Sequence, residues 1–175
     1  MLYVGLLHWP CLDKNGEEIA TAITNLDLHD IARVCLTYGI DTLYIVHPYQ
    51  GQLDFAKKIT DHWIKGFGGD YNPIRKKALE VIRLVSDMEE IRRQTGARMV
   101  GTSAARIDDC MSWADARDLV QTEDVCLLFG TGWGIAPRVL KTLDGVIEPI
   151  DAGGDFNHLS VRSAVSIAID RIVGR

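Results

Sequence analysis

The sequence has no apolar run long enough to cross a bilayer. Its first ten residues, MLYVGLLHWP, lack the basic segment and the small-residue cleavage site of a signal peptide, so they predict a first β-strand. We therefore expect a cytoplasmic protein that does not contact a membrane. Hydrophobic residues make up 47% and charged residues 25% of the 175 positions, which is typical of a single globular domain over residues 1–175.

Cysteine is scarce and no Cys-x-x-Cys pair occurs, so we expect reduced, mostly buried thiols and no metal site. The net charge of −5 argues against a chain that holds nucleic acid by overall charge alone. Lysines and arginines nevertheless gather between residues 57 and 98, where Arg75, Lys76 and Lys77 are consecutive. This cluster predicts either a solvated helix face or a local surface that binds RNA.

Strand-like apolar segments alternate with amphipathic helical segments, which predicts an α/β fold with a mostly parallel sheet flanked by helices. The expected strands cover residues 2–10, 41–48, 97–105, 124–130 and 145–150. The expected helices cover residues 24–40, 52–67, 112–121, 135–143 and 157–174, with a short helix before residue 97. One more helix is expected to begin at Pro73 after an Asn72 cap, with Ile74, Ala78, Ile82 and Val85 facing inward.

The stretch LLFGTGWGIAP, from Leu127 to Pro137, carries an apolar strand into three glycines spaced by two. It fits neither the G-x-G-x-x-G dinucleotide fingerprint nor the Walker loop, and the chain has no G-x-S-x-G elbow. Glycines here would let backbone groups approach a ligand without a Cβ in the way. The alternative is a tight turn that packs Trp133 into the core.

Two further loops follow predicted strands, where ligands of open parallel sheets bind. Residues 101–105 read GTSAA, and residues 148–160 read EPIDAGGDFNHLS before the last helix. Each polar residue also has a structural interpretation. Asn157 could cap the last helix, Ser160 and Ser163 could be small packing residues, and Arg33 could be a solvent or salt-bridge residue.

Taken in order, these motifs resemble the SPOUT superfamily of S-adenosylmethionine-dependent RNA methyltransferases, and its SpoU branch in particular. The segment TNLDLHDIARVCLTYGIDTLYIVHP resembles the first motif, because Arg33 lies on a helix six residues before Gly39 and a strand follows. LLFGTGWGIAP resembles the second motif, and NHLSVRSAVSIAI resembles the third. The combination of FGTGWG, EPI and NHLSVRSA is similar to a small bacterial family of RNA methyltransferase-like proteins, and the resemblance spans nearly the whole chain.

This resemblance implies a deep trefoil knot near the C-terminus, a homodimer, and S-adenosylmethionine bound in the knot. It implies methyl transfer to tRNA or rRNA, at a ribose 2′-oxygen or a base nitrogen. Arg33 is expected to position the acceptor with help from His158 or Ser160, and Arg33 and the Arg75 to Lys77 cluster are expected to bind RNA. The residues expected to hold the cofactor are Thr102, Ser103, Ala104, Leu128, Phe129, Gly130, Thr131, Gly132, Trp133, Gly134, Ile150, Asn157, His158, Leu159, Ser160 and Ser163.

The chain departs from the SpoU pattern at three places. SpoU sequences carry Asn-x-x-Asn-x-Gly before the arginine, a glutamate between the glycines of the second motif, and an asparagine where His158 stands; this chain reads TNLDLHDIAR, GTGWG and His158. The acceptor atom is therefore left open. Two other functions are also left open: a non-catalytic knotted dimer that holds S-adenosylmethionine or RNA, and a nucleotide-binding protein of Rossmann or flavodoxin type.

Overall fold

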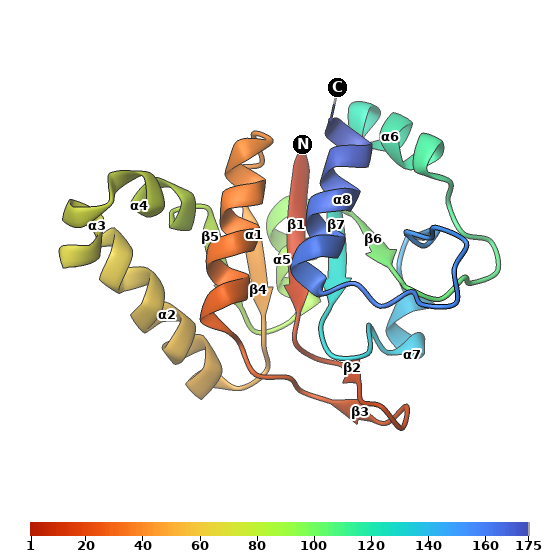
Figure 1. Ribbon diagram of the computed structural model, residues 1–175, viewed down its shortest axis with the longest axis horizontal. Coiled ribbons are helices and arrows are strands. Elements are labelled where there is room, and N and C mark those ends of the chain that lie inside the picture. Colours follow the sequence, from red (N-terminus) through yellow and green to blue (C-terminus); the bar gives the residue numbers. More distant parts are fainter. Residues whose placement is uncertain (175) are drawn as a thin grey trace.

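Residues 1–174, which the computed structural model describes, contain a six-stranded sheet with helices on both faces (Figure 1). The strand order is β5-β4-β1-β7-β6-β8, and every neighbouring pair is parallel. The strands are β1 (Leu2–Leu7), β4 (Leu43–Val46), β5 (Ile82–Val85), β6 (Arg98–Thr102), β7 (Val125–Gly130) and β8 (Gly145–Ile147). The predicted α/β fold is confirmed.

Each face of the sheet has its own apolar core. One core takes residues from α1 (Asn25–Thr37), α2 (Gln50–Ile64), α4 (Pro73–Leu79), α6 (Trp113–Thr122) and α8 (Val161–Val173), and the other from α5 (Met88–Thr95) and α7 (Pro137–Leu140). Strand β7 contributes side chains to both cores, because Leu127 and Phe129 belong to the first core while Cys126 and Leu128 belong to the second. This two-sided burial explains why β7 shows no polar alternation.

The sheet changes its winding direction between β1 and β7. Strands β4 and β5 extend it on one side of β1, and β7, β6 and β8 extend it on the other. Such a switch point leaves a crevice beyond the carboxyl ends of the strands. The three loops that the sequence singled out follow β6, β7 and β8, so they meet at this edge.

The helix that begins at Pro73 is shorter than predicted. Asn72 caps it as expected, because its Oδ1 accepts the backbone N–H of Arg75 at 3.0 Å. The helix ends at Leu79, however, and Ile82–Val85 pair with β4 as strand β5, while Ile74 is exposed rather than inward. Isoleucine and valine pack well on a pleated surface, so pairing with β4 overrides the helical spacing.

Several other boundaries also differ from the prediction. The polar segment after β1 contains a small antiparallel hairpin of β2 (Cys11–Leu12) and β3 (Glu18–Ile19), and a separate short helix α3 (Phe67–Tyr71) follows α2. The helix expected over 135–143 covers only Pro137–Leu140, and the last helix begins at Val161 with Ser160 as its cap. Within residues 1–174, no helix has both the length and the apolar character needed to cross a membrane.

Candidate active site

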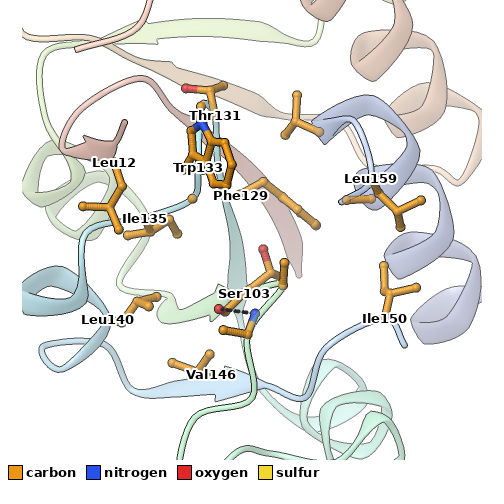
Figure 2. Close-up of a pocket in the computed structure, with 18 of the residues that line it drawn as sticks. Leu12, Ser103, Phe129, Thr131, Trp133, Ile135, Leu140, Val146, Ile150 and Leu159 are labelled. Atoms are coloured by element: carbon orange, nitrogen blue, oxygen red, sulfur yellow. Dashed lines mark hydrogen bonds between the residues drawn. The ribbon is translucent and has the colours of Figure 1, made fainter. Parts of the chain in front are cut away.

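A cavity of about 1240 Å³ lies beyond the carboxyl ends of β6, β7 and β8 (Figure 2). Its volume exceeds the range of about 300 to 1,000 Å³ that is usual for small-molecule sites, so it has room for a cofactor and part of a second ligand. Most of the predicted cofactor residues line it: Thr102, Ser103, Ala104, Phe129, Gly130, Thr131, Gly132, Trp133, Gly134, Ile150, Asn157, His158, Leu159 and Ser160.

Two predicted cofactor residues do not line the cavity. The side chain of Leu128 is fully buried in the core on the other face of the sheet, because neighbouring residues of a strand point to opposite faces. Its backbone carbonyl accepts the Thr102 hydroxyl at 2.9 Å, so it joins β7 to the end of β6. Ser163 lines a neighbouring groove between α1 and α8.

The glycine loop, residues 130–134, is locked against the β2–β3 hairpin. The Trp133 N–H donates to the Leu12 carbonyl at 2.9 Å, and the Leu12 N–H donates to the Gly134 carbonyl at 2.9 Å. Gly132 has φ +59°, and a Cβ there would lie 2.8 Å from the Leu12 oxygen. Glycine is therefore required by the left-handed backbone and by the approach of the hairpin.

Trp133 itself is 60% exposed and lines the cavity, so the alternative that packs it into the core is wrong. Its ring meets the imidazole of His158 edge-on, with centroids 5.3 Å apart, and the ring of Phe156 also meets that imidazole edge-on, with centroids 5.5 Å apart. The loops after β7 and β8 thus place three exposed aromatic rings beside the cavity. Such rings can stack on a purine or pyrimidine.

The charges of the cavity are mostly negative. In the part of the chain that the structure describes, its charged lining consists of one lysine and five carboxylates: Lys141, Asp27, Asp108, Asp109, Glu148 and Asp155. Arg162 lies 3.7 Å from Asp27 and Arg106 lies 3.8 Å from Glu148, whereas Asp108, Asp109 and Asp155 form no salt bridge within the described residues. The lining therefore keeps a negative charge that would repel a nucleotide's phosphates and attract a cation. The sulfonium and ammonium groups of S-adenosylmethionine match that charge, and the apolar side chains that face the cavity in Figure 2, Phe129 and Ile150 among them, match its adenosine.

Arg33 is separate from the cavity. It is exposed on α1 and lines the groove between α1 and α8 that also contains Ser163. Ser160 lines both the groove and the cavity, and its Oγ lies 3.0 Å from the hydroxyl of Ser163. Of the three predicted catalytic residues, His158 and Ser160 therefore share the cavity, while Arg33 lines only the neighbouring groove.

Asn157 connects two of the loops rather than capping the last helix. Its side-chain Nδ2 donates to the backbone carbonyl of Ala104 at 2.9 Å, which joins the loop after β8 to the loop after β6. Ser160 instead caps α8, because its Oγ accepts the Ser163 N–H at 3.3 Å. The cavity wall is thus held by contacts between segments far apart in the sequence.

Sequence reasoning missed a buried polar network beneath the glycine loop. The hydroxyl of Thr131 donates to the Leu7 carbonyl at 3.1 Å, the hydroxyl of Thr21 bonds to that of Thr131, and His8 Nδ1 lies 3.0 Å from the Thr21 hydroxyl. Each hydroxyl has one proton, so Thr21 donates to Thr131 and His8 Nδ1 donates to Thr21. His8 Nε2 then carries no proton, and among the described residues it has no hydrogen-bond partner.

We expect protonation of His8 to lower the free energy of unfolding by about 3 kcal/mol as the pH drops from 6.5 to about 4. Burial, and then repulsion from the nearby His47, lowers the pKa of His8 from 6.5 to about 4. The unfolded chain takes up this proton near pH 6.5 but the folded chain only near pH 4, so acid favours unfolding. Urea unfolding across this pH window measures the slope.

The variant His8→Gln should have a shallower pH slope than the wild-type protein, because it removes the group that titrates. The matched control is His62→Gln, which removes an exposed histidine of α2 and should keep the wild-type slope. Equal slopes in the wild type and in His8→Gln would contradict the neutral, buried state assigned to His8.

The chain matches a family described as SAM-dependent RNA methyltransferase over residues 1–174. It is 37% identical to an uncharacterized protein of Aquifex aeolicus, over 99% of this chain and 89% of that protein. It is 39% identical to a tRNA (guanine-N(1)-)-methyltransferase of Oleidesulfovibrio alaskensis, over 99% of this chain but only 42% of that protein. The chain therefore spans less than half the length of this curated methyltransferase.

Solved structures share the fold. TrmJ from Z. mobilis ZM4 superimposes with a TM-score of 0.61 at 17% identity, covering 98% of this chain and 67% of that one. The TrmH/SpoU tRNA modifying enzyme of A. aeolicus superimposes with a TM-score of 0.57 at 15% identity, covering 98% and 72%. The cavity at the switch point, the SPOUT fold and the family match over residues 1–174 lead to one conclusion: this chain belongs to the SAM-dependent RNA methyltransferase family.

Proposed function

We propose that this chain transfers a methyl group from S-adenosylmethionine to RNA, with the cofactor in the cavity beside the glycine loop. The observation that carries this proposal is the chemistry of the cavity lining. Its charged groups are five carboxylates and one lysine in the described chain, which suits a sulfonium cation and opposes the phosphates of NAD. The Rossmann and flavodoxin alternatives require a site for phosphate, so the lining disfavours both.

Each wall of the cavity would bind a different part of the reactants. The backbone of Gly130 to Gly134 and the side chains of Ile150 and Leu159 would hold the adenosine, because they combine free backbone groups with apolar surface. When bound, S-adenosylmethionine supplies an electrophilic methyl group. The protein must then hold the acceptor in line with that methyl and exclude water from it.

The acceptor is proposed to enter through the groove between α1 and α8. The Arg33 guanidinium would bind an RNA phosphate, since its planar fork can donate two parallel hydrogen bonds. Ser160, which lines both groove and cavity, would orient the acceptor at the boundary. For a hydroxyl acceptor, the imidazole of His158 would take its proton.

The proposed substrate is tRNA, because two relatives that are 39% identical to this chain are named tRNA (guanine-N(1)-)-methyltransferases. Both relatives extend well beyond the part that this chain matches, so their guanine position is not carried over. A ribose 2′-oxygen and a base nitrogen are both kept as acceptors. The homodimer and the trefoil knot stay predictions from the family resemblance.

Nucleoside mass spectrometry of RNA from a strain that lacks this gene tests the function. We expect one methylated nucleoside to disappear from the tRNA fraction and to return when the wild-type gene is restored. The position of that methyl also decides between ribose and base. Identical nucleoside inventories with and without the gene would contradict methyl transfer and would favour the non-catalytic binding module.

A further inference from the structure

Three large apolar side chains are exposed together on α3 and α4. Phe67 and Tyr71 of α3 are 75% and 77% exposed, and Ile74 of α4 is 83% exposed. The two aromatic rings lie one helical turn apart with centroids separated by 6.2 Å and planes inclined by only 25°. They form a nearly parallel pair in water, which we call the aromatic platform (Phe67 and Tyr71). An exposed apolar cluster of this kind is typical of a binding surface.

The outward position of the platform is fixed by the backbone. A Cβ on Gly68 would lie 2.7 Å from the ring of Trp63, and one on Gly69 would lie 2.4 Å from the Trp63 carbonyl oxygen. Helix α3 therefore packs directly on the end of α2 through its glycines, and Gly68 and Gly69 are buried. Since Phe67 and Tyr71 stay in water on a tightly packed segment, their exposure points to a ligand.

The surroundings of the platform are positively charged. Residues 50–79, which contain helices α2 to α4, carry six lysines and arginines against three aspartates, although the whole chain has a net charge of −5. Lys57 and Lys65 share Asp61, whereas Arg75, Lys76 and Lys77 form no salt bridge within residues 1–174.

Two of these cations lie beside the aromatic groups. A Cβ on Gly69 would be 3.2 Å from Cδ of Lys76, which places the stem of this lysine against α3. The guanidinium of Arg75 lies 4.6 Å from the ring centroid of Trp63, on which Gly68 packs. Parallel aromatic rings with cations next to them are how proteins bind single-stranded nucleic acid, because bases stack and phosphates pair with the cations.

We propose that the aromatic platform binds unpaired bases of RNA, with Lys76 and Lys77 on the adjoining phosphates. This proposal rests on the proposed function for the choice of RNA over another polyanion. Figure 1 places α3 and α4 beyond β5, at the opposite end of the sheet from β6 and β8, where the cavity lies. The platform therefore binds a part of the RNA away from the nucleotide that receives the methyl group.

Fluorescence anisotropy with a labelled oligo(A) of about ten nucleotides, and with a duplex of equal length, tests the platform in the full chain. We expect Phe67→Ala and Tyr71→Ala each to weaken binding of the single strand roughly tenfold, because each removes one stacking ring. Phe67→Tyr and Tyr71→Phe keep the rings and should bind like the wild type. Phe55→Ala, which removes an exposed aromatic side chain of α2 outside the platform, is the matched control and should bind normally.

Unchanged binding of the single strand by both alanine variants would overturn the proposal. An equal loss for single strand and duplex would also overturn it, because stacking requires unpaired bases. A change of oligomeric state in light scattering, with RNA affinity intact, would assign the platform to a protein contact instead. If the wild-type chain binds oligo(A) through the platform but methylates no RNA, the proposed function fails and the platform stands.

Discussion

Replacing Gly130 by alanine is expected to weaken S-adenosylmethionine binding roughly tenfold or more and to lower the free energy of unfolding by about 1 to 3 kcal/mol. A Cβ at this position would lie 2.6 Å from the backbone nitrogen of Ile135 and 2.8 Å from the carbonyl carbon of Gly134. Both are backbone atoms, so no side chain can rotate away. The glycine loop would have to open, and the cavity wall would move with it.

Calorimetric titration measures the affinity, and urea unfolding measures the stability. Gly154→Ala is the matched control, since it makes the same chemical change in the loop after β8, where a Cβ has nothing within 4 Å. The control should keep the wild-type affinity and stability. Cofactor affinity in Gly130→Ala within twofold of wild type would contradict a role for the glycine loop in cofactor binding.

Replacing Arg33 by alanine is expected to lower kcat/KM for RNA on the order of 100-fold while the affinity for S-adenosylmethionine stays the same. The reason is its location, because Arg33 lines the groove between α1 and α8 and not the cavity. Its loss should therefore misplace the RNA acceptor without disturbing the cofactor. Transfer of labelled methyl groups to RNA gives the rate, and calorimetry gives the cofactor affinity.

Arg33→Lys should recover only part of the rate, because an ammonium group lacks the planar fork that binds phosphate with two hydrogen bonds. Lys14→Ala, which removes an exposed cation at the turn of the β2–β3 hairpin, controls for a general loss of positive charge. Full methyl transfer by Arg33→Ala would remove Arg33 from the acceptor site. A parallel loss of cofactor affinity would assign it to the cavity instead.

The position of the site could be predicted from the sequence, because it depends on strand ends. A parallel sheet brings the ends of β6, β7 and β8 to one edge, so the loops that follow them meet without any knowledge of side-chain packing. The glycines of the second loop could also be predicted as a place without Cβ atoms. The contact that requires glycine at position 132, the approach of the Leu12 carbonyl from the β2–β3 hairpin, could not be predicted, because it joins segments far apart in the sequence.

Individual side chains were harder to place, for geometrical reasons. Leu128 and Phe129 are neighbours in the sequence but point to opposite faces of β7, and only Phe129 lines the cavity. Ser160 and Ser163 lie one turn apart at the start of α8, yet only Ser160 reaches the cavity. Assigning every residue of a motif to one site therefore includes residues whose side chains point away from that site.

Features that need contacts between distant segments could not be predicted from the sequence at all. The His8, Thr21 and Thr131 network joins residues up to 123 positions apart, and the carboxylates of the cavity come from three separate segments. The sequence predicts a helix over residues 82–85 because their apolar spacing fits a helix as well as a strand, and only the pairing with β4 distinguishes the two. Tertiary contact decides each of these cases.

Calorimetric titration of the wild-type chain with S-adenosylmethionine, S-adenosylhomocysteine and NAD decides which ligand the cavity binds. We expect saturable binding of the two adenosyl ligands at a single site and no binding of NAD, because the acidic lining of the cavity opposes phosphate. Binding of NAD without binding of either adenosyl ligand would contradict the assignment of this cavity to S-adenosylmethionine.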